Sequence, residues 1–391
     1  MRALFTTLPA TGHFNSIMQM ALAVAAAGHD VAVCCSPAFA DELRRSGLEH
    51  LPGGADDLES ISGGAPPLGD PRRRQFMQLE VFAGRAALAM IPDLVRHAEA
   101  WRPDVLVNEN GEMAASLVAE KLDRPHASIG AGSLSSLPER REQLGPTLSI
   151  RRAELGLPPD PEAEMLFRYL HFAFVPPRWD GEVAHPETIH FIRYENPDRP
   201  GEVRPGWLDA PRDRPLVLAS LGTLMNGLPG LFEAIIEAVA GEPIEVVAAI
   251  GRGQDPARFG TPPTNVRIEA FVPQILVLAE STLFVAHGGF NGTKEALRLG
   301  LPLVVIPIGG DQPYTAERVE ALGLGRAVAP SERDPATIRS RIREVLADER
   351  FRRNAQAFAA DMQALPPMEH AVALLEELAR ERQPIPRSPD W

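Results

Sequence analysis

The sequence has few of the features that mark secreted, membrane or metal-binding proteins. It contains two cysteines, Cys34 and Cys35, which are adjacent within an apolar run. Two neighbouring buried thiols predict neither a disulfide framework nor a metal site. No apolar run is long enough to span a bilayer, and the first residues lack the apolar core and cleavage site of a signal peptide. We therefore expect a cytoplasmic protein without a membrane partner.

Positive charge is also scarce. The 39 Lys and Arg residues face 52 Asp and Glu residues, which gives a formal net charge of −13. Nucleic acids and anionic membranes attract basic surfaces, so neither is an expected partner. An anionic ligand would need a local positive feature, such as the N-terminus of a helix.

Two sequence signatures of other enzyme classes are missing. A predicted first strand at 2–9 is followed by Ala10-Thr11-Gly12-His13, which has one glycine where a dinucleotide-binding G-x-G-x-x-G motif would lie. This difference argues against a dehydrogenase. We find no D-x-D-like carboxylate pair for a metal, because Asp56 and Asp57 are adjacent in a polar loop.

What the sequence does contain is a repeated strand–helix alternation. The 391 residues favour two domains. The first half predicts strands at 2–9, 30–35, 48–51, 103–108 and 125–129, with helices at 14–27, 37–46, 75–100 and 111–122. A mobile loop is expected at 53–74, and two further helices at 150–155 and 162–172. This pattern is typical of a doubly wound parallel sheet.

A second series of the same kind follows. It predicts strands at 215–220, 244–250, 266–269, 283–286, 303–307 and 327–328, with helices between and after them to residue 380. The proline-rich, charged segment at 193–214 favours a linker. We assign an N-terminal domain to 1–195, the linker to 196–214, a C-terminal domain to 215–365 and a final helical segment to 366–391.

The segment 287–313, HGGFNGTKEALRLGLPLVVIPIGGDQP, carries the most specific pattern. Gly288-Gly289 allows a close approach of the backbone, and a helix is predicted to start near Asn291. Its unpaired N–H groups and dipole suit a phosphate, to which Thr293 can add a hydroxyl and His287 a ring N–H. After the next strand, Asp311 and Gln312 offer donors and acceptors for sugar hydroxyls.

This segment resembles the nucleotide-sugar glycosyltransferases of the GT-B type. It is most similar to the UDP-glycosyltransferase-like family, and within it to the natural-product (antibiotic) glycosyltransferases of actinobacteria. The matching positions are His287, Gly289, Gly292, Thr293, Glu295, Gly300, Pro302, Pro307, Asp311 and Gln312. The resemblance implies an α/β fold of two Rossmann-like domains facing across a cleft, with the last helix packing back on the N-terminal domain.

The resemblance also implies roles for individual residues of the donor site. Thr223, in Ser220-Leu221-Gly222-Thr223, would contact a phosphate, although a helix cap is the alternative. Phe271-Val272-Pro273-Gln274 is similar to the family's [WF]-x-P-Q motif, in which Phe271 would stack on the base and the Val272 backbone would pair with it. Glu295 would bind ribose hydroxyls or be an exposed helical glutamate. Asn291 would contact the donor, and Asp311 and Gln312 would bind its sugar.

A candidate general base lies in the first half. His13 follows the first predicted strand, where α/β sheets place catalytic groups. The resemblance implies that His13 is the general base and that a carboxylate supports it. Glu109 stands where the family commonly has Asp, so it is either the partner of His13 or an exposed loop carboxylate, with Asn108 and Asn110 as fallback partners. Imidazole has an unperturbed pKa of about 6.5, which suits proton transfer near neutral pH.

The predicted function is an inverting, metal-independent transfer of a (deoxy)sugar from a TDP- or UDP-sugar to a hydroxyl of a hydrophobic natural-product aglycone. The nucleotide sugar is a co-substrate, and no cofactor is expected. Phe76, Met77, Phe82 and Met90 hint at the aglycone, with core packing as the preferred interpretation. A nucleotide-sugar epimerase or hydrolase and a non-catalytic nucleotide-sugar-binding partner of a transferase stay open as alternatives. The sequence leaves open whether the chain forms a homodimer.

Overall fold

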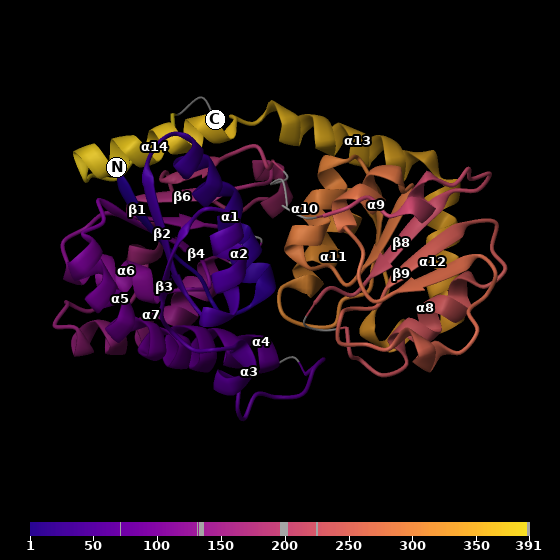
Figure 1. Cartoon of the computed structure of the whole chain (residues 1–391), viewed down its shortest axis with the longest axis horizontal. Coiled ribbons are helices and arrows are strands. Elements are labelled where there is room, and N and C mark those ends of the chain that lie inside the picture. Colours follow the sequence, from indigo (N-terminus) through magenta and orange to yellow (C-terminus); the bar gives the residue numbers. More distant parts are fainter. Residues whose placement is uncertain (71, 131, 133–136, 196–201, 224–225, 389–391) are drawn as a thin grey trace. The chain divides into compact units, whose positions relative to one another are not determined.

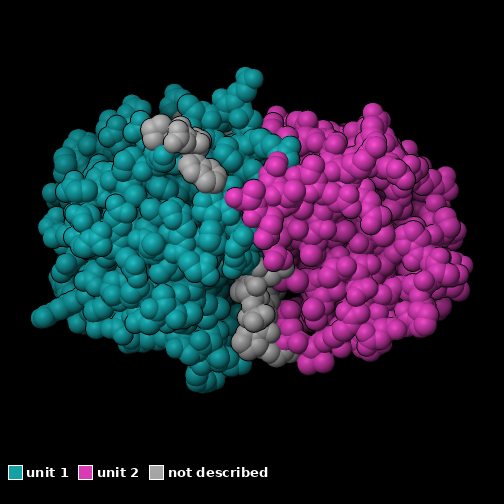
Figure 2. Space-filling model, turned by 90° about the horizontal axis from the view of Figure 1, so that it is seen from above, with its two compact units in different colours: residues 1–67, 72–200, 365–391 teal, residues 68–71, 201–364 magenta. Residues whose placement is uncertain are grey.

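The computed structural model of the protein describes residues 1–70, 72–130, 132, 137–195, 202–223 and 226–388. The chain divides into two compact units (Figure 2). Unit 1 comprises residues 1–67, 72–200 and 365–391, and unit 2 comprises 68–71 and 201–364. Of the predicted linker, residues 196–201 lie outside the described part. Within the described ranges, no helix has the length and apolarity needed to cross a membrane.

Unit 1 is built on a seven-stranded parallel sheet with the order β3-β2-β1-β4-β5-β6-β7 (Figure 1). Its strands are β1 (Arg2–Thr6), β2 (Asp30–Cys35), β3 (Glu49–Pro52), β4 (Val105–Glu109), β5 (His126–Ile129), β6 (Leu170–Ala173) and β7 (Ile189–Phe191). Their near-continuous buried runs are typical of parallel strands covered on both faces. The order reverses between β1 and β4, and ligands of such sheets bind outside the carboxyl ends of the strands at that point.

The helices of unit 1 differ from the prediction in several places. They are α1 (Thr11–Ala26), α2 (Ala40–Arg45), α3 (Leu58–Ile61), α4 (Arg72–Phe76), α5 (Ala87–Trp101), α6 (Ala114–Lys121), α7 (Leu137–Glu154) and α14 (Met368–Glu381). Between α4 and α5 the chain forms a π-helix, η2 (Met77–Ala86). The predicted loop at 53–74 is therefore partly helical in its described residues. The predicted single helix at 75–100 is a π-helix followed by an α-helix that contains Pro92.

In one segment of unit 1 the predicted type of secondary structure is wrong. The helix expected at 162–172 is a single 3-10 turn, η3 (Glu164–Phe167), followed by strand β6. Phe167 and Phe172 of this segment are buried and belong to the core, whereas Tyr169 is half-buried. The short strand β7 was not predicted.

The C-terminal helix α14 is part of unit 1, where it packs against α1. His29, in the turn after α1, lies 2.7 Å from the Glu376 carboxylate of α14, and Arg382 pairs with Asp123 at 2.8 Å. Leu374, Leu375 and Leu378 are buried on one side of α14. This placement is the one that the family resemblance implies for the last helix.

Unit 2 contains a six-stranded parallel sheet with the order β10-β9-β8-β11-β12-β13. The strands are β8 (Leu216–Ser220), β9 (Glu245–Ala249), β10 (Val266–Glu269), β11 (Leu283–Ala286), β12 (Leu303–Val305) and β13 (Gly325–Ala327). The helices are α8 (Leu231–Val239), α9 (Gln274–Glu280), α10 (Phe290–Arg298), α11 (Gln312–Ala321), α12 (Pro335–Ala347) and α13 (Glu349–Ala364). The order reverses between β8 and β11.

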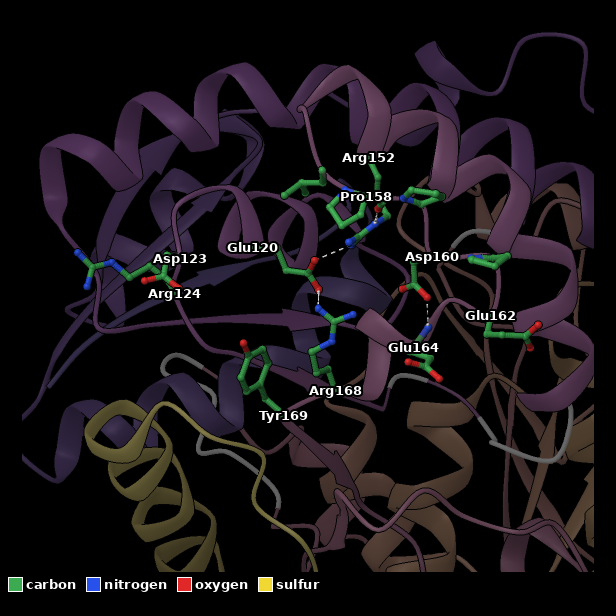
Figure 3. A pocket seen from close by; sticks show the side chains of 13 residues that line it. Glu120, Asp123, Arg124, Arg152, Pro158, Asp160, Glu162, Glu164, Arg168 and Tyr169 are labelled. Carbon is green, nitrogen blue, oxygen red and sulfur yellow. Dashed lines mark hydrogen bonds and ion pairs between the residues drawn. The ribbon is translucent and has the colours of Figure 1, made fainter.

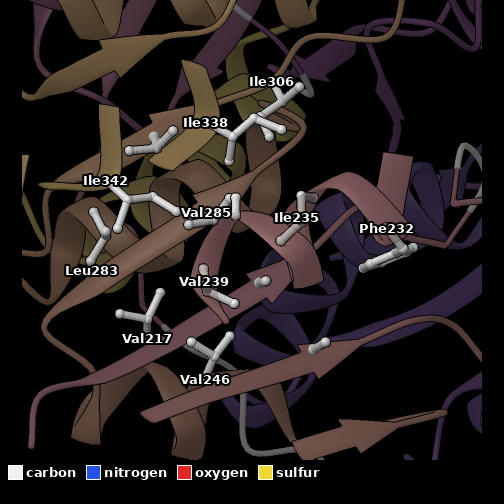
Figure 4. Close-up of a cluster of buried hydrophobic side chains, with 14 of the residues drawn as sticks. Val217, Phe232, Ile235, Val239, Val246, Leu283, Val285, Ile306, Ile338 and Ile342 are labelled. Atoms are coloured by element: carbon white, nitrogen blue, oxygen red, sulfur yellow. The ribbon is translucent and has the colours of Figure 1, made fainter. Parts of the chain in front are cut away.

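The core of unit 2 lies between the sheet and helices α8 and α12 (Figure 4). Val217, Val246 and Val285 point from three strands to one face of the sheet. Ile235 of α8 and Ile338 of α12 pack over them. Burying each such side chain contributes about 1.5–3 kcal/mol. The core thus fixes β8 and β11, whose carboxyl ends carry part of the predicted donor site.

Candidate active site

Each unit brings predicted site residues to the point where its strand order reverses. In unit 1, His13 lies in the first turn of α1, directly after β1, and Glu109 is the last residue of β4. In unit 2, Gly222 and Thr223 follow β8, and His287 follows β11. These are the positions at which open α/β sheets bind ligands.

In unit 1 the structure pairs His13 with Glu109. His13 Nδ1 lies 3.0 Å from Glu109 Oε1, and the exposed fractions of the two side chains are 23% and 0%. The alternative of an exposed loop carboxylate at Glu109 is therefore wrong. Burial alone would raise the pKa of Glu109, but the attraction of His13 and hydrogen bonds hold this pKa below its usual value. Glu109 is consequently an anion that can orient the imidazole.

The backbone around Glu109 explains how a side chain one methylene longer than Asp fits. The Gly111 N–H donates to Oε2 at 2.6 Å, and the Leu8 N–H donates to Oε1 at 3.3 Å. A Cβ atom on Gly111 would lie 2.9 Å from Oε2 and 3.1 Å from His13 Cε1. Glycine at 111 therefore makes room for the His13–Glu109 pair. Sequence reasoning did not identify Gly111 as a site residue.

Asn108, which was an alternative candidate for the partner of His13, forms hydrogen bonds with the backbone instead. Its side-chain amide donates to the carbonyl oxygens of Glu109 at 2.9 Å and Glu112 at 2.6 Å. These bonds hold the turn that follows β4. Asn108 thus supports the shape of the loop that carries the carboxylate.

A second buried carboxylate, Glu112, lies in the same turn. Its Oε2 accepts a 2.5 Å hydrogen bond from the Thr6 hydroxyl, and its Oε1 accepts one from the Ala114 N–H at 2.8 Å. Burial raises the pKa of Glu112 to about 7, with a smaller contribution from the charge on Glu109. Glu112 connects the end of β1 to the first turn of α6.

Of the apolar residues considered for the acceptor site, Phe82 lies beside His13, the candidate general base. Its ring lies 5.7 Å from the His13 ring at an interplanar angle of 74°, and the side chain is half-buried. Phe82 belongs to the π-helix η2, a rare structure that often occurs at functional sites. Met90, in contrast, is buried against Cys34 and is a core residue.

In unit 2 the His287 ring is enclosed by two glycines. A Cβ atom on Gly222 would lie 2.6 Å from the ring, and one on Gly289 would lie 2.5 Å from it. Burial lowers the pKa of His287 to about 4, only partly offset by a hydrogen bond with the Ser220 backbone. The ring is therefore neutral at pH 7 and carries a single N–H, which either the Ser220 carbonyl or a ligand can accept.

The helix that begins after Gly289 is the predicted phosphate-binding element. Gly289 is the N-cap of α10, which starts at Phe290, slightly earlier than predicted. Asn291 and Gly292 are half-buried in its first turn, and Thr223 is exposed in the loop after β8. Thr293 is only 1% exposed, and its hydroxyl donates to the Gly289 carbonyl at 3.0 Å. The Thr293 hydroxyl thus stabilises the helix start in this structure.

Gln274 and Glu295, both predicted to serve the donor, bind each other. Gln274 Nε2 donates to Glu295 Oε2 at 2.7 Å. Glu295 is only 1% exposed, so the alternative of an exposed helical glutamate is wrong. The bond joins the first residue of α9 to α10 and fixes the carboxylate near the start of both helices.

The predicted base-stacking residue, Phe271, follows β10 and is 46% exposed. Val272 beside it is buried. The guanidinium of Arg252, from the loop after β9, lies 3.7 Å from the centre of the Phe271 ring. Arg252 was not identified from the sequence, although Gly251-Arg252-Gly253 directly after a predicted strand could have drawn attention to it.

The loop after β12 carries the predicted sugar-binding pair. Gln312 is 4% exposed, and its Oε1 accepts hydrogen bonds from the Ile308 N–H at 2.7 Å and the Gly309 N–H at 3.0 Å. The Gln312 carbonyl therefore holds the loop. Asp311 is half-buried immediately before α11.

Unit 1 also contains a cavity that none of its predicted site residues lines (Figure 3). It has a volume of about 470 Å³ and includes Glu120, which pairs with Arg152 at 2.6 Å and with Arg168. Its residues come from the end of α6, the end of α7 and the chain between α7 and β6, at the amino ends of the strands. This edge of the sheet is opposite to the one that carries His13.

Comparisons with known proteins agree with this arrangement. Residues 233–378 match the family of Erythromycin biosynthesis protein CIII-like, C-terminal domain. The chain is 27% identical to the NDP-glycosyltransferase YjiC of Bacillus subtilis, covering 94% of this chain and 95% of that protein. It is 29% identical to the TDP-daunosamine transferase DnrS of Streptomyces peucetius, covering 98% of each.

Solved structures show the same fold over nearly the whole chain. The spinosyn rhamnosyltransferase SpnG superposes with a TM-score of 0.82 at 24% identity, covering 96% of this chain and all of that one. The glycosyltransferase VinC, solved with dTDP, superposes with a TM-score of 0.80 at 25% identity, covering 97% and 100%. The predicted fold class is confirmed. The chain is a glycosyltransferase of the GT-B fold, and its residues 233–378 form an EryCIII-like C-terminal domain.

Proposed function

We propose that the chain transfers a sugar, with inversion and without a metal ion, from a TDP-sugar to a hydroxyl of a hydrophobic natural-product aglycone. The main observation behind this proposal is the His13–Glu109 pair at 3.0 Å, located at the switch point of the first sheet. The choice of TDP over UDP rests on two relatives: DnrS is named for a TDP-sugar, and VinC was solved with dTDP. UDP remains the alternative nucleotide.

In the proposed reaction His13 is the general base. Glu109 lies at Nδ1, so Nε2 receives the proton of the acceptor hydroxyl. The acceptor oxygen forms a bond to the anomeric carbon while the bond from that carbon to the diphosphate breaks. The electron pair of the broken bond leaves with TDP. The configuration at the anomeric carbon inverts, as it does in inverting hydrolysis, where water is the acceptor. Glu109 stabilises the imidazolium that forms.

The leaving diphosphate gains negative charge in this step. We assign its stabilisation to the N–H groups at the start of α10 and to the neutral His287 ring. Glu295 would receive the ribose hydroxyls, and Asp311 the sugar. Phe82 is the proposed apolar wall for the aglycone, because it is half-buried beside His13.

The test is a calorimetric titration with dTDP and UDP in the presence of EDTA, for the wild type and His13→Ala. We expect dTDP to bind both proteins with equal affinity. A TDP-sugar is then incubated with hydrophobic hydroxyl-bearing compounds, and we expect a glycosylated product from the wild type only. If neither nucleotide binds, the donor site is wrong. If His13→Ala transfers as fast as the wild type, the role of His13 is wrong.

A further inference from the structure

The contact between Arg252 and Phe271 has features that a chance surface contact would lack. The guanidinium covers one face of the ring at 3.7 Å. Phe271 is nevertheless 46% exposed, so the guanidinium leaves much of the residue open to solvent. Phe271 follows the edge strand β10, and Arg252 follows its neighbour β9. Both residues therefore lie at the ligand-binding edge of the second sheet.

Arg252 differs from the other arginine that stacks nearby. Arg258 covers the Phe259 ring at 4.7 Å, but it also pairs with the Glu233 carboxylate at 2.5 Å. Arg252 has neither an ion pair nor a hydrogen bond with any residue that the structure describes. Its stacking on Phe271 is therefore not the by-product of a salt bridge.

The loop that carries Arg252 is held close to the loop after β8. Gly251 has a φ of +101°, and a Cβ atom there would lie 2.1 Å from Asn226 Nδ2. The same Asn226 amide donates to the Gly222 carbonyl at 2.8 Å. Because only glycine fits at 251, the backbone before Arg252 is fixed against the loop that follows β8.

We infer that Arg252 is a positioning residue for the donor nucleotide: it holds the Phe271 ring from behind, so that the pyrimidine base stacks on the open face. This inference rests on the proposed function, because it assumes that Phe271 receives the base. Phenylalanine offers a smaller stacking surface than the tryptophan common at this position in the resembling family. A guanidinium on its far side restricts the rotation of the ring and adds a cation–π contact.

The experiment compares dTDP affinities of the wild type, Arg252→Ala, Phe271→Ala and the double variant by calorimetry. A contact of this kind predicts that Arg252→Ala weakens dTDP binding about two- to fivefold. In the Phe271→Ala background the same replacement should have no effect, because Arg252 acts through the ring. Inorganic pyrophosphate, which has no base, should bind the wild type and Arg252→Ala alike. The matched control is Arg258→Ala, which removes a stacked arginine from the same loop and should leave dTDP affinity unchanged.

Each outcome decides the inference. If the wild type binds dTDP and Arg252→Ala binds it equally well, Arg252 has no positioning role, while the proposed function stands. If Arg252→Ala weakens dTDP in the Phe271→Ala background as well, or weakens pyrophosphate, the guanidinium acts by charge and the inference is overturned. If the wild type binds neither dTDP nor UDP, the proposed donor site and this inference fall together. In the transfer reaction we expect Arg252→Ala to raise the KM for the TDP-sugar with kcat unchanged.

Discussion

Shortening Glu109 by one methylene group is the most direct test of the catalytic pair. In Glu109→Asp the carboxylate retracts by about one C–C bond, roughly 1.5 Å. The present 3.0 Å contact between Oε1 and His13 Nδ1 would open beyond hydrogen-bonding distance. The hydrogen bonds from the Gly111 and Leu8 N–H groups would be lost as well. Aspartate, which is common at this position in the resembling family, should therefore impair this protein.

The size of the effect follows from the bond that is lost. A hydrogen bond to a charged group contributes about 1.5–3 kcal/mol. If this stabilisation applies mainly to the imidazolium of the transition state, kcat should fall roughly 10- to 150-fold. Glu109→Gln keeps the length but removes the charge, and it should lower kcat at least as far.

The assay is the initial rate of glycoside formation from a TDP-sugar at saturating acceptor. A dTDP titration of each variant reports whether unit 2 remains intact, and circular dichroism reports the fold of the whole chain. Glu99→Asp is the matched control, because Glu99 is exposed on α5 and the same shortening there should leave kcat unchanged. A folded Glu109→Asp protein with wild-type kcat would refute the argument that the reach of this carboxylate orients His13.

Three further predictions concern residues around the two switch points. Gly111→Ala should lower kcat at least tenfold and leave dTDP binding intact, because its Cβ would lie 2.9 Å from Glu109 Oε2; undiminished kcat would contradict this. Gly289→Ala should weaken dTDP binding about tenfold or more in calorimetry, because its Cβ would lie 2.5 Å from the His287 ring, whereas Gly206→Ala, with open space around its Cβ, should bind normally. Glu112 has its folded-state pKa raised from the ordinary value of 4.5 to about 7, so its contribution to stability is present below the lower value and is lost as the pH rises to 7. Glu112→Gln should therefore gain in melting temperature relative to the wild type between pH 5 and pH 8, and a constant difference across this range would exclude the titration of Glu112.

The parts of the fold that were predictable are those in which chemistry and periodicity agree. The bounds of β2, β10 and β11 match the predicted strands, because each is a short segment with apolar, mostly β-branched residues at alternate or successive positions between turn residues. Strand β6 was mistaken for a helix. Its four residues, Leu170–Ala173, are too few to show a period of two, and His171 interrupts the apolar run although it is buried. The conformation of so short a segment depends on the strands beside it in the sheet, and the local sequence pattern carries no information about those strands.

In the candidate site, too, the local sequence does not contain the contacts that individual atoms make in the folded chain. The position of His13 followed from the rule that parallel strands carry their functional residues at their carboxyl ends, whereas Glu109 was identified only through the family resemblance. Their contact depends on the missing side chain of Gly111, which only the folded backbone brings beside them. Likewise, the sequence offered Thr293 and Gln312 as ligands, but their hydrogen bonds to Gly289, Ile308 and Gly309 depend on the path of the backbone.

The return of α14 to unit 1 has a consequence for how the chain is made and recombined. Unit 1 is completed by a segment that is synthesised after unit 2, so the surface of α1 that packs against α14 stays uncovered until all of unit 2 has been synthesised. Unit 2, which ends at residue 364, can complete its own fold earlier. A chimera joined once, near residue 201, would place a foreign α14 on this α1 and leave His29 without an assured carboxylate partner in the position of Glu376. A hybrid enzyme with an exchanged donor half therefore needs a second junction near residue 365.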